Sequence, residues 1–334
     1  MPSNPPTVTA RAGTNIALVK YWGKRDAALN LPAAGSLSLT LADLGSTTRV
    51  RFAADLAGDR VSFEGRAADP RFAGRVSRFL DLVRTRAGLR HFAEVATSNT
   101  VPTAAGLASS AAGFAALALA ASRAAGLHLS PTELSELARR GSGSAARSIF
   151  GGFVAMEPGV RSDGSDAVAH GLLDENAWDV RLCVAITAEG EKAVGSSEAM
   201  ERTAQTSPYY ADWLASVPAD LEQARAAVET RNLGALGAVA ERSALRMHAC
   251  AMAADPPILY WNPATLAVLA TTRQLRADGT AAFFTIDAGP HVKVVCTAVD
   301  AAKVKAALAS TPGVMRVLVL TPGPGARIVG ESSG

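Results

Sequence analysis

The sequence predicts an α+β fold made of two lobes that share one cleft. Strand and helix patterns are mixed along the chain, without the regular βαβ order of a parallel sheet. The 334 residues are 49% hydrophobic and 19% charged, a balance typical of a globular protein with a substantial core. We place the boundary near Arg181, so that residues 1–180 form an N-terminal lobe and residues 181–334 a C-terminal lobe.

The first hundred residues are expected to be mainly strands, because short apolar or alternating runs recur in them. One helix, at about Phe72–Ala87, interrupts these runs. The expected strands are Val8–Arg11, Ile16–Tyr21, Ser36–Leu41, Thr47–Phe52 and Phe92–Thr97.

Two helices follow. The alanine-rich run Ala111–Ser122 is too short and too weakly apolar to cross a bilayer of about 30 Å, so it predicts a buried helix. The next helix begins at Ser130, because Ser130-Pro131-Thr132-Glu133 combines a capping box with proline at the first helical position. We expect that helix to end near Arg139–Arg140.

The remainder contains a long helical region between strands. Helical periodicity extends from Tyr209 to Arg276 and is expected to break at Pro218, at Asn232-Leu233-Gly234 and at Asp255-Pro256-Pro257. The other expected elements are the strands Phe153–Met156, Val180–Thr187, Ala281–Ile286 and Val292–Thr297, a polar loop at Gly159–Asp166, a helix at Ala301–Ala309, and the strand Met315–Leu320, which closes the chain.

Composition and charge argue against several classes of protein. The three cysteines are widely spaced, and neither HExxH nor CxxC occurs, so we expect no disulfide framework and no protein-held metal. The net charge is +3, but the basic residues do not cluster and aromatic residues are only 5%, which argues against nucleic-acid binding. Met1–Thr14 has no apolar run, so we expect no signal peptide and no membrane association, and the cysteine pattern favours a reducing, cytoplasmic location.

The segment Pro102–Ser110, directly before the alanine-rich helix, is a candidate phosphate-binding loop. Gly106 lets a ligand approach the backbone, and the N–H groups at a helix N-terminus favour anions. Ser109 and Ser110 add hydroxyl groups. An ordinary serine-capped turn fits the same pattern, and no Walker sequence is present.

The small-residue run Gly141–Ala146, followed by Arg147, is a second candidate for anion binding. The run fits the GxGxx[GA] dinucleotide pattern, but it follows a helix instead of a strand, so we reject a Rossmann site. Arg147 could direct a bidentate guanidinium at a carboxylate or phosphate. A turn between helices with a surface arginine is the alternative.

Charged residues near two expected strands are candidates for catalysis. Asp287 follows an apolar run and precedes Ala288-Gly289-Pro290, a position from which a carboxylate could reach a cleft as a base or hydroxyl-orienting group. The same aspartate could instead make an Asx turn. Lys20 and Lys24 could flank an anionic substrate, or could be solvated lysines around a packed Trp22.

Six segments carry a wider resemblance. They are Asn15–Asp26 (NIALVKYWGKRD), Ser36–Leu41 (SLSLTL), Val101–Gly113 (VPTAAGLASSAAG), Arg139–Phe153 (RRGSGSAARSIFGGF), Leu245–Ala249 (LRMHA) and Phe284–Val294 (FTIDAGPHVKV). In this order they resemble the mevalonate diphosphate decarboxylase family of the galactokinase–homoserine kinase–mevalonate kinase–phosphomevalonate kinase (GHMP) superfamily. The first and last segments are the most specific, and the resemblance covers nearly the whole chain.

The resemblance implies a two-lobed GHMP-kinase-like fold with mixed or antiparallel sheets. It also implies an ATP-dependent carboxy-lyase that phosphorylates the 3-hydroxyl of mevalonate 5-diphosphate and then releases phosphate and CO₂ to give isopentenyl diphosphate. The implied cofactors are ATP and Mg²⁺, the metal being held by the nucleotide phosphates, and the implied assembly is a homodimer.

The resemblance also assigns site residues. The implied catalytic residues are Asp287, beside the substrate's C3 hydroxyl, and Arg147, Lys20 and Ser109. The implied substrate-binding residues are Asn15, Tyr21, Lys24, Ser142, Gly143, Ser144, Arg147 and Ser196. The implied ATP-binding residues are Asn99, Pro102, Gly106, Leu107, Ala108, Ser109, Ser110 and Lys192.

Two departures from the family pattern bear on the substrate. Ser196-Ser197 stands where bacterial diphosphate-using members carry Ser-Arg, and Pro32–Ser36 replaces an asparagine-containing stretch. Loss of one charged phosphate contact weakens binding by about 1.5–3 kcal/mol. The alternatives are therefore a monophosphate-using decarboxylase and a 3-kinase without decarboxylation. A non-catalytic nucleotide-binding protein is disfavoured, because it would need neither Asp287 nor Lys20.

Overall fold

The computed structural model describes residues 6–100, 109–190 and 193–332, in which the strands form a large sheet, a small sheet and a separate hairpin. The large sheet contains β1 (Thr7–Val19), β4 (Ser36–Ala53), β5 (Arg60–Phe63), β6 (Arg66–Ala67), β7 (Phe92–Asn99), β8 (Phe153–Met156), β9 (Ala169–Leu173) and β14 (Arg327–Ser332). The small sheet contains β10 (Val180–Ile186), β11 (Ala282–Ile286), β12 (Val292–Thr297) and β13 (Arg316–Leu320), and the hairpin pairs β2 (Lys24–Asp26) with β3 (Leu31–Pro32).

The strand order confirms the α+β class. The large sheet runs β14-β1-β4-β7-β5-β6, with β8 and β9 attached at β4, and only the β5–β7 pair among its described strands is parallel. The small sheet runs β11-β12-β10-β13 and is antiparallel. Such sheets need no repeated βαβ crossovers, which agrees with the irregular alternation in the sequence.

Two pairs of expected strands are single long strands in the structure. β1 joins the expected strands on either side of Gly13, and β4 joins those on either side of Gly45. The two glycines pair with each other where the register shifts. A Cβ on Gly13 would lie 2.3 Å from the Leu41 carbonyl oxygen, so this close backbone contact requires glycine.

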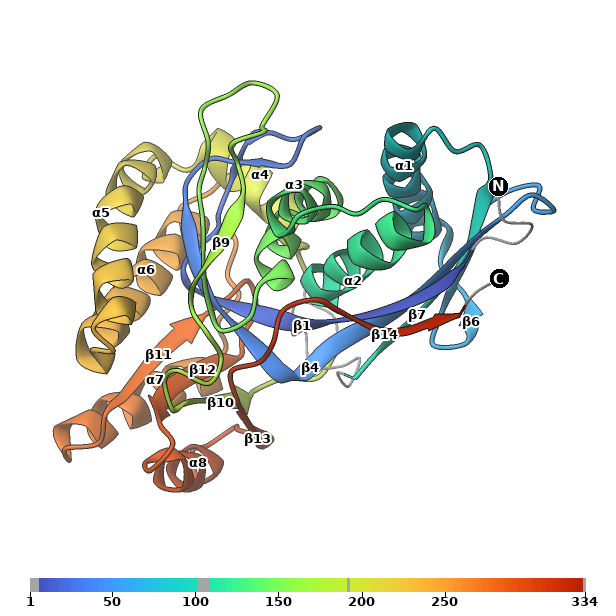
Figure 1. The fold of residues 1–334 in the computed structure, drawn as a ribbon. Coiled ribbons are helices and arrows are strands. Elements are labelled where there is room, and N and C mark those ends of the chain that lie inside the picture. Colours follow the sequence, from blue (N-terminus) through green and yellow to red (C-terminus); the bar gives the residue numbers. More distant parts are fainter. Residues whose placement is uncertain (1–5, 101–108, 191–192, 333–334) are drawn as a thin grey trace.

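The helices cover the sheets from defined sides (Figure 1). The helices are α1 (Pro70–Ala87), α2 (Ser109–Ala124), α3 (Pro131–Gly141), the 3-10 helix η2 (Gly143–Ile149), α4 (Ser196–Thr206), α5 (Tyr210–Glu229), α6 (Leu233–Met252), α7 (Pro263–Ala277) and α8 (Ala301–Ala309). α1, α2 and α3 pack with the large sheet around one core. α6 packs on one face of the small sheet, and α7 and α8 pack on the other. α5 packs against α6 and against β1, β4 and β9 of the large sheet.

The core under α5 and α6 connects the two sheets. It contains Ile16 of β1 and Leu37 of β4 from the large sheet, together with Leu182 of β10 and Leu236 of α6. This shared apolar contact fixes the end of β1 against the small sheet. The residues that follow β1 therefore face the ends of β11 and β12.

The helix expectations are largely confirmed. α2 is the expected buried alanine-rich helix, and α3 begins with the expected Ser130–Glu133 capping box. The expected break at Pro218 is wrong, because α5 continues through it. Val217 and Leu221 are buried on the core side of α5, and their packing offsets the hydrogen bond that proline cannot make.

The sequence predicted that the strand ending at Leu320 is the last element of the chain, and this prediction is wrong. β14 follows it and pairs antiparallel with the first half of β1, so both described ends of the chain lie at the same edge of the large sheet (Figure 1). The sequence Arg327–Ser332 is mostly polar, which hid its strand character.

The three cysteines, Cys183, Cys250 and Cys296, are buried and free. In the described part of the chain, no helix is long and apolar enough to span a membrane.

Candidate active site

Three charged side chains meet where β1 ends and β11 turns into β12. Lys20 follows β1, Asp287 follows β11, and Lys293 lies in β12. Lys20 Nζ is 2.6 Å from Asp287 Oδ1, and Lys293 Nζ is 3.2 Å from Asp287 Oδ2. The Asp287 side chain is 31% exposed, whereas those of Lys20 and Lys293 are 2% and 4% exposed. The carboxylate is therefore the member of this cluster that a ligand can reach.

The two lysines control the ionisation of Asp287. Burial by itself raises the pKa of the Asp287 carboxyl, but Lys20 and Lys293 outweigh burial and hold that pKa well below its usual range. Burial also lowers the pKa of the Lys20 ammonium to about 8, although Asp287 opposes the shift. Below pH 8 the cluster carries more positive than negative charge, which favours an anionic ligand.

Arg147 lies in η2 and is buried, so the alternative of a surface arginine is wrong. Its Nε donates to Ser38 Oγ at 3.0 Å and its Nη1 to Ser36 Oγ at 2.7 Å, both on β4. Its Nη2 donates to Asn15 Oδ1 at 3.1 Å. Burial lowers the pKa of Arg147 to about 10, so the guanidinium remains charged at neutral pH. These bonds fix its plane.

Asn15 joins β1 to η2. Its Nδ2 donates to the Ser144 carbonyl at 2.9 Å and to Ser148 Oγ at 2.8 Å, while its Oδ1 accepts from Arg147. Both ends of the Asn15 amide are thus engaged with the protein. Through these hydrogen bonds Asn15 orients Arg147 and the Gly143–Ile149 helix.

Tyr21 and Gly143 lie in close contact beside Arg147. The Arg147 guanidinium is 5.8 Å from the centre of the Tyr21 ring. A Cβ on Gly143 would lie 2.1 Å from the Tyr21 hydroxyl oxygen, so only glycine permits this approach. The Tyr21 hydroxyl is buried and has no hydrogen-bond partner among the described residues. Burial raises its pKa to about 12, so it stays a donor.

We call Tyr21, Ser142, Gly143, Ser144 and Arg147 the anion cluster. The hydroxyl groups of Ser142 and Ser144 lie 3.4 Å apart, next to the backbone of Gly143. The cluster combines three hydroxyl groups with one buried cation. Such a set of donors suits a phosphate or carboxylate ligand.

The remaining implied substrate residues lie on other elements. Lys24 is in β2 and Ser196 begins α4. Burial lowers the pKa of Lys24, Arg75 adds to the shift, and Glu201 of α4 opposes it, so Lys24 is within electrostatic reach of α4. Ser197 is exposed on α4. In the described part of the chain, no hydrogen bond joins Lys24 or Ser197 to the anion cluster.

Two of the residues that the resemblance assigns to ATP binding line one pocket of about 150 Å³. Asn99 ends β7 and Ser110 lies in the first turn of α2. Phe63, Phe72 and Phe114 contribute aromatic walls to the same pocket. Apolar walls beside a helix N-terminus fit a nucleotide, because the base is flat and the phosphates are anionic. Four implied loop residues, Pro102, Gly106, Leu107 and Ala108, and also Lys192 and the Ser109 side chain, lie outside what the structure describes.

A metal ion would have few protein ligands here. No group of three or more His, Cys, Asp or Glu side chains among the described residues could hold one. Mg²⁺ commonly binds through substrate phosphates with few carboxylates, so the residues present fit a phosphate-held ion.

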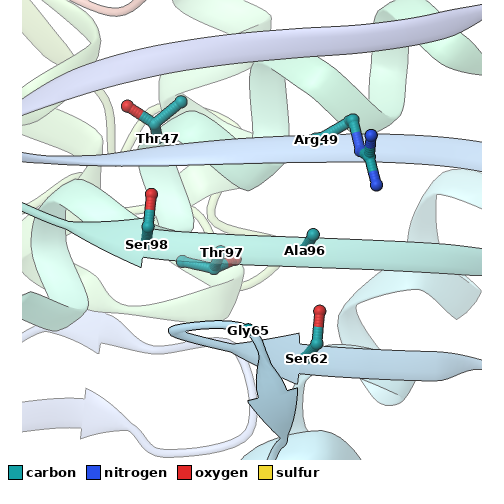
Figure 2. A pocket seen from close by; sticks show the side chains of 7 residues that line it. All are labelled: Thr47, Arg49, Ser62, Gly65, Ala96, Thr97 and Ser98. Atoms are coloured by element: carbon teal, nitrogen blue, oxygen red, sulfur yellow. The ribbon is translucent and has the colours of Figure 1, made fainter.

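A separate pocket of about 230 Å³ lies on β4, β5 and β7 (Figure 2). It is lined by Thr47, Arg49, Ser62, Gly65, Ala96, Thr97 and Ser98. This pocket contains no carboxylate and none of the implied site residues. It offers no group for acid–base chemistry, so we assign no catalytic role to it.

Several residues of the site were missed from the sequence. Lys293 had a usable signal, because it is a lysine inside the apolar strand β12. Ser36 and Ser38 are two residues apart in a strand and therefore share a face. His248 of α6 had no local signal. Its imidazole hydrogen-bonds to the Ile286 carbonyl, and burial and Lys20 lower its pKa to about 3, so the ring is neutral.

Comparisons with known proteins give one family. Residues 12–169 match the diphosphomevalonate decarboxylase-like N-terminal domain, and residues 182–316 match the mevalonate 5-diphosphate decarboxylase C-terminal domain. The diphosphomevalonate decarboxylase of Bos taurus is 36% identical over 308 residues, which cover 86% of this chain and 76% of the relative.

Solved structures agree with this match. The mevalonate diphosphate decarboxylase of Staphylococcus aureus has a TM-score of 0.92 at 37% identity, covering 97% of this chain and 98% of that chain. The complex of MDDEF with MVAPP, AMPPCP and magnesium has a TM-score of 0.90 at 41% identity, covering 96% of this chain and 98% of that chain.

Proposed function

The chain belongs to the diphosphomevalonate decarboxylase family, and on that premise we propose that it uses ATP to convert mevalonate 5-diphosphate into isopentenyl diphosphate, ADP, phosphate and CO₂. The observation that carries this proposal is the Asp287 carboxylate, reachable by a ligand and held between two buried lysines. The relative crystallised with MVAPP, AMPPCP and magnesium supports the same substrates for this chain.

In the first step, Asp287 accepts a hydrogen bond from the C3 hydroxyl of the substrate and orients its oxygen toward the transferred phosphoryl group. The hydroxyl proton passes to Asp287 as the new O–P bond forms and the bond to ADP breaks. Because Lys20 and Lys293 keep the pKa of Asp287 low, the carboxylate is a weak base. The loose transition state of phosphoryl transfer needs little base strength, so orientation is its main contribution.

In the second step, the C3–O bond breaks and phosphate leaves with the bonding pair and the proton from Asp287. The electron pair of the C1–C2 bond forms the C2=C3 double bond, and CO₂ is released. Positive charge develops at C3 in this step. Asp287, ionised again because of its low pKa, stabilises that charge.

The phosphorylated end of the substrate is assigned to the anion cluster, with Lys24 and Ser196 at its outer side. ATP is assigned to the segment from Asn99 to Ser110 and to Lys192, and Lys20 is assigned to the neighbourhood of the transferred phosphoryl group. Mg²⁺, held by the nucleotide phosphates, would offset their negative charge. Each of these assignments is an inference from the residue types and the geometry described above.

A monophosphate-using decarboxylase is the second candidate, and the charges on α4 favour it. Ser197 supplies no charge, and Arg202, the nearest arginine along the chain, is paired with Glu198 at 2.5 Å. Glu201 of α4 lies within electrostatic reach of Lys24. This arrangement places less positive charge on α4 than an arginine at position 197 would.

The test is to measure ADP and CO₂ together, with purified protein, Mg²⁺ and ATP, and with mevalonate, its 5-phosphate or its 5-diphosphate. Equal amounts of ADP and CO₂ from the diphosphate are expected. Activity with the monophosphate alone would favour the second candidate. ADP without CO₂ would identify a kinase, and neither product from any of the three would contradict both decarboxylase proposals.

Substitution at position 197 tests how the phosphate end is recognised. Ser197→Arg should raise kcat/KM for the diphosphate relative to the monophosphate by about tenfold or more, because it adds a charged phosphate contact. Ser197→Gln, which has similar reach without charge, is the matched control. An unchanged ratio in Ser197→Arg would show that this position does not contact the phosphates.

We also infer a homodimer and a cytoplasmic location, and two lobes divided near residue 181. The first inference rests on the family's usual assembly. Light scattering after size-exclusion chromatography tests it, and a mass of one chain at micromolar concentration would contradict it.

A further inference from the structure

Arg139 of α3 is a fully buried cation that forms no ion pair within the described part of the chain. Its exposed fraction is 0%, and it makes no salt bridge with any described residue. Glu136, one turn earlier in α3, makes the strongest electrostatic attraction to Arg139, but the two side chains do not form an ion pair. A buried charge is costly unless it is paired, so an unpaired one calls for a functional reason.

The Arg139 guanidinium ties two other segments to α3. Its Nη1 donates to the Leu29 carbonyl at 2.5 Å, and its Nη2 donates to the Gly164 carbonyl at 2.9 Å. Leu29 lies in the turn of the β2–β3 hairpin, which carries Lys24. Gly164 lies in the polar loop before β9, and a Cβ there would be 2.9 Å from Arg139 Nη2. Arg139 thus holds the hairpin and the loop to α3 through hydrogen bonds. Because both acceptors are uncharged carbonyl oxygens, the positive charge of Arg139 is not neutralised.

That charge is within electrostatic reach of Tyr21, one member of the anion cluster. Arg139 and Arg147 are both within electrostatic reach of the Tyr21 hydroxyl, which has no hydrogen-bond partner among the described residues. The Arg139 Nε is also buried without a partner in the described part of the chain. Two buried arginines, neither in an ion pair with a described residue, therefore lie near one phenol donor.

We propose that Arg139 is a positioning residue for the phosphate end of the substrate: it holds the Lys24 hairpin in place and supplies a second buried positive charge to the anion cluster. A bound diphosphate or phosphate would provide the negative charge that Arg139 lacks in the protein. This inference rests on the proposed function for the identity of the substrate, but not for the presence of an anion site.

Kinetics of three variants test the proposal. Arg139→Met should raise KM for mevalonate 5-diphosphate by about tenfold or more, with kcat and KM for ATP within about threefold of the parent. Arg139→Lys keeps the charge and should recover most of the loss. Arg140→Met, which removes the same charge from the neighbouring, partly exposed position, is the matched control and should resemble the parent. The proposal would be overturned if Arg139→Met changed kcat and the KM values for both substrates together. It would also be overturned if Arg140→Met raised KM for mevalonate 5-diphosphate as much as Arg139→Met does.

Binding of inorganic pyrophosphate gives a second measurement that needs no turnover. At constant ionic strength, increasing pyrophosphate should raise the Tm of the parent until the site is saturated. Arg139→Gln should bind pyrophosphate about tenfold or more weakly than the parent, whereas Arg139→Lys should bind it with an affinity close to that of the parent. Equal affinity in Arg139→Gln and the parent would overturn the proposal. A parent that binds pyrophosphate through Arg139 but releases no CO₂ would refute the proposed function alone. If Arg139→Met does not fold, Arg139→Lys and Arg139→Gln decide the outcome by the same comparison.

Discussion

Asp287 owes its properties to two lysines that are far from each other in the sequence. Lys20 follows the first strand and Lys293 lies near the end of the chain, yet both contact the same carboxylate. Their attraction keeps the carboxylate ionised, and its partial exposure leaves it open to a ligand. Asp287 and Lys20 were predicted from the sequence, whereas their contact and the presence of Lys293 were not.

Replacing Asp287 by asparagine keeps the size of the side chain and removes its charge. We expect Asp287→Asn to lower kcat by about 10²–10⁴-fold, because the amide can neither accept the hydroxyl proton nor stabilise positive charge at C3. ATP affinity, measured by fluorescent-nucleotide titration, should change little. Asp278→Asn, at the exposed end of α7, is the matched control. A variant with near-parental kcat would remove Asp287 from the mechanism.

The pKa of Lys20 predicts the alkaline limit of activity. With that pKa at about 8, kcat should fall above pH 8 as the ammonium next to Asp287 is lost. Deprotonation of Lys20 would not lower kcat by unfolding the protein. The pKa of Lys20 is lower in the folded protein than the usual lysine value of 10.5, so between pH 8 and 10.5 this group makes the folded state more stable as pH rises.

A pH series of kcat, with urea unfolding at pH 7 and pH 9, checks this expectation. In Lys20→Arg, whose charge does not titrate in this range, the alkaline limb near pH 8 should disappear. A parental kcat that stays constant up to pH 10 would contradict the assignment.

At the scale of elements, η2 shows how a short helix places several groups at once. The sequence suggested a small-residue cradle in the run that follows Gly141. The structure resolves most of it into a 3-10 helix that buries Arg147 against β4 and presents the Gly143 backbone to Tyr21. Three residues per turn and small side chains allow this close approach of three elements.

A methyl group at Gly143 should disturb the anion cluster. In Gly143→Ala the new Cβ would meet the Tyr21 hydroxyl at 2.1 Å, so the phenol must move. We expect KM for the phosphorylated substrate to rise about tenfold, with KM for ATP unchanged. Gly171→Ala in β9, where the nearest atom is 4.0 Å away, is the matched control. Equal KM values in both variants would show that Tyr21 and Gly143 do not bind substrate.

At the scale of the whole molecule, β1 and β4 run through both cores and give the site a rigid base. The first half of β1 and the second half of β4 pack with α1–α3. The end of β1 that leads to Lys20 and the first half of β4 pack under α5 and α6. β14 completes the large sheet at the edge of β1, where Ile328 packs against the first core.

Removal of β14 should destabilise the fold without touching the site. A chain that ends at Ala326 loses the β1–β14 hydrogen bonds and the partial burial of Ile328, and we expect a loss of roughly 2 kcal/mol and a Tm lower by a few °C. Its kcat at low temperature should stay near that of the parent, because β14 pairs with Thr7–Arg11 and not with the part of β1 that carries Asn15. Calorimetry and kinetics at 10 °C check both expectations. An unchanged Tm would show that β14 adds no stability.

The sequence by itself determined the α+β class, the start of α3 at its Ser130–Glu133 capping box, the buried alanine-rich helix and the family of the chain. Those features depend on local rules or on long segments that resemble the family's motifs, such as Phe284–Val294, and a single sequence displays both. The continuity of β1 through Gly13, of β4 through Gly45 and of α5 through Pro218, and the existence of β14, were not predictable, because packing and strand pairing override local preference.

Only the tertiary structure decided how the charges are paired. It buried Arg147 on two serines and an asparagine, left Arg139 on carbonyl oxygens alone, and placed Lys20 and Lys293 on either side of Asp287. Charge pairing depends on distances of a few ångströms between residues far apart in the chain, and on how much water burial excludes. The sequence supplies the charged groups, and the fold sets which of them neutralise each other and which remain for the ligand.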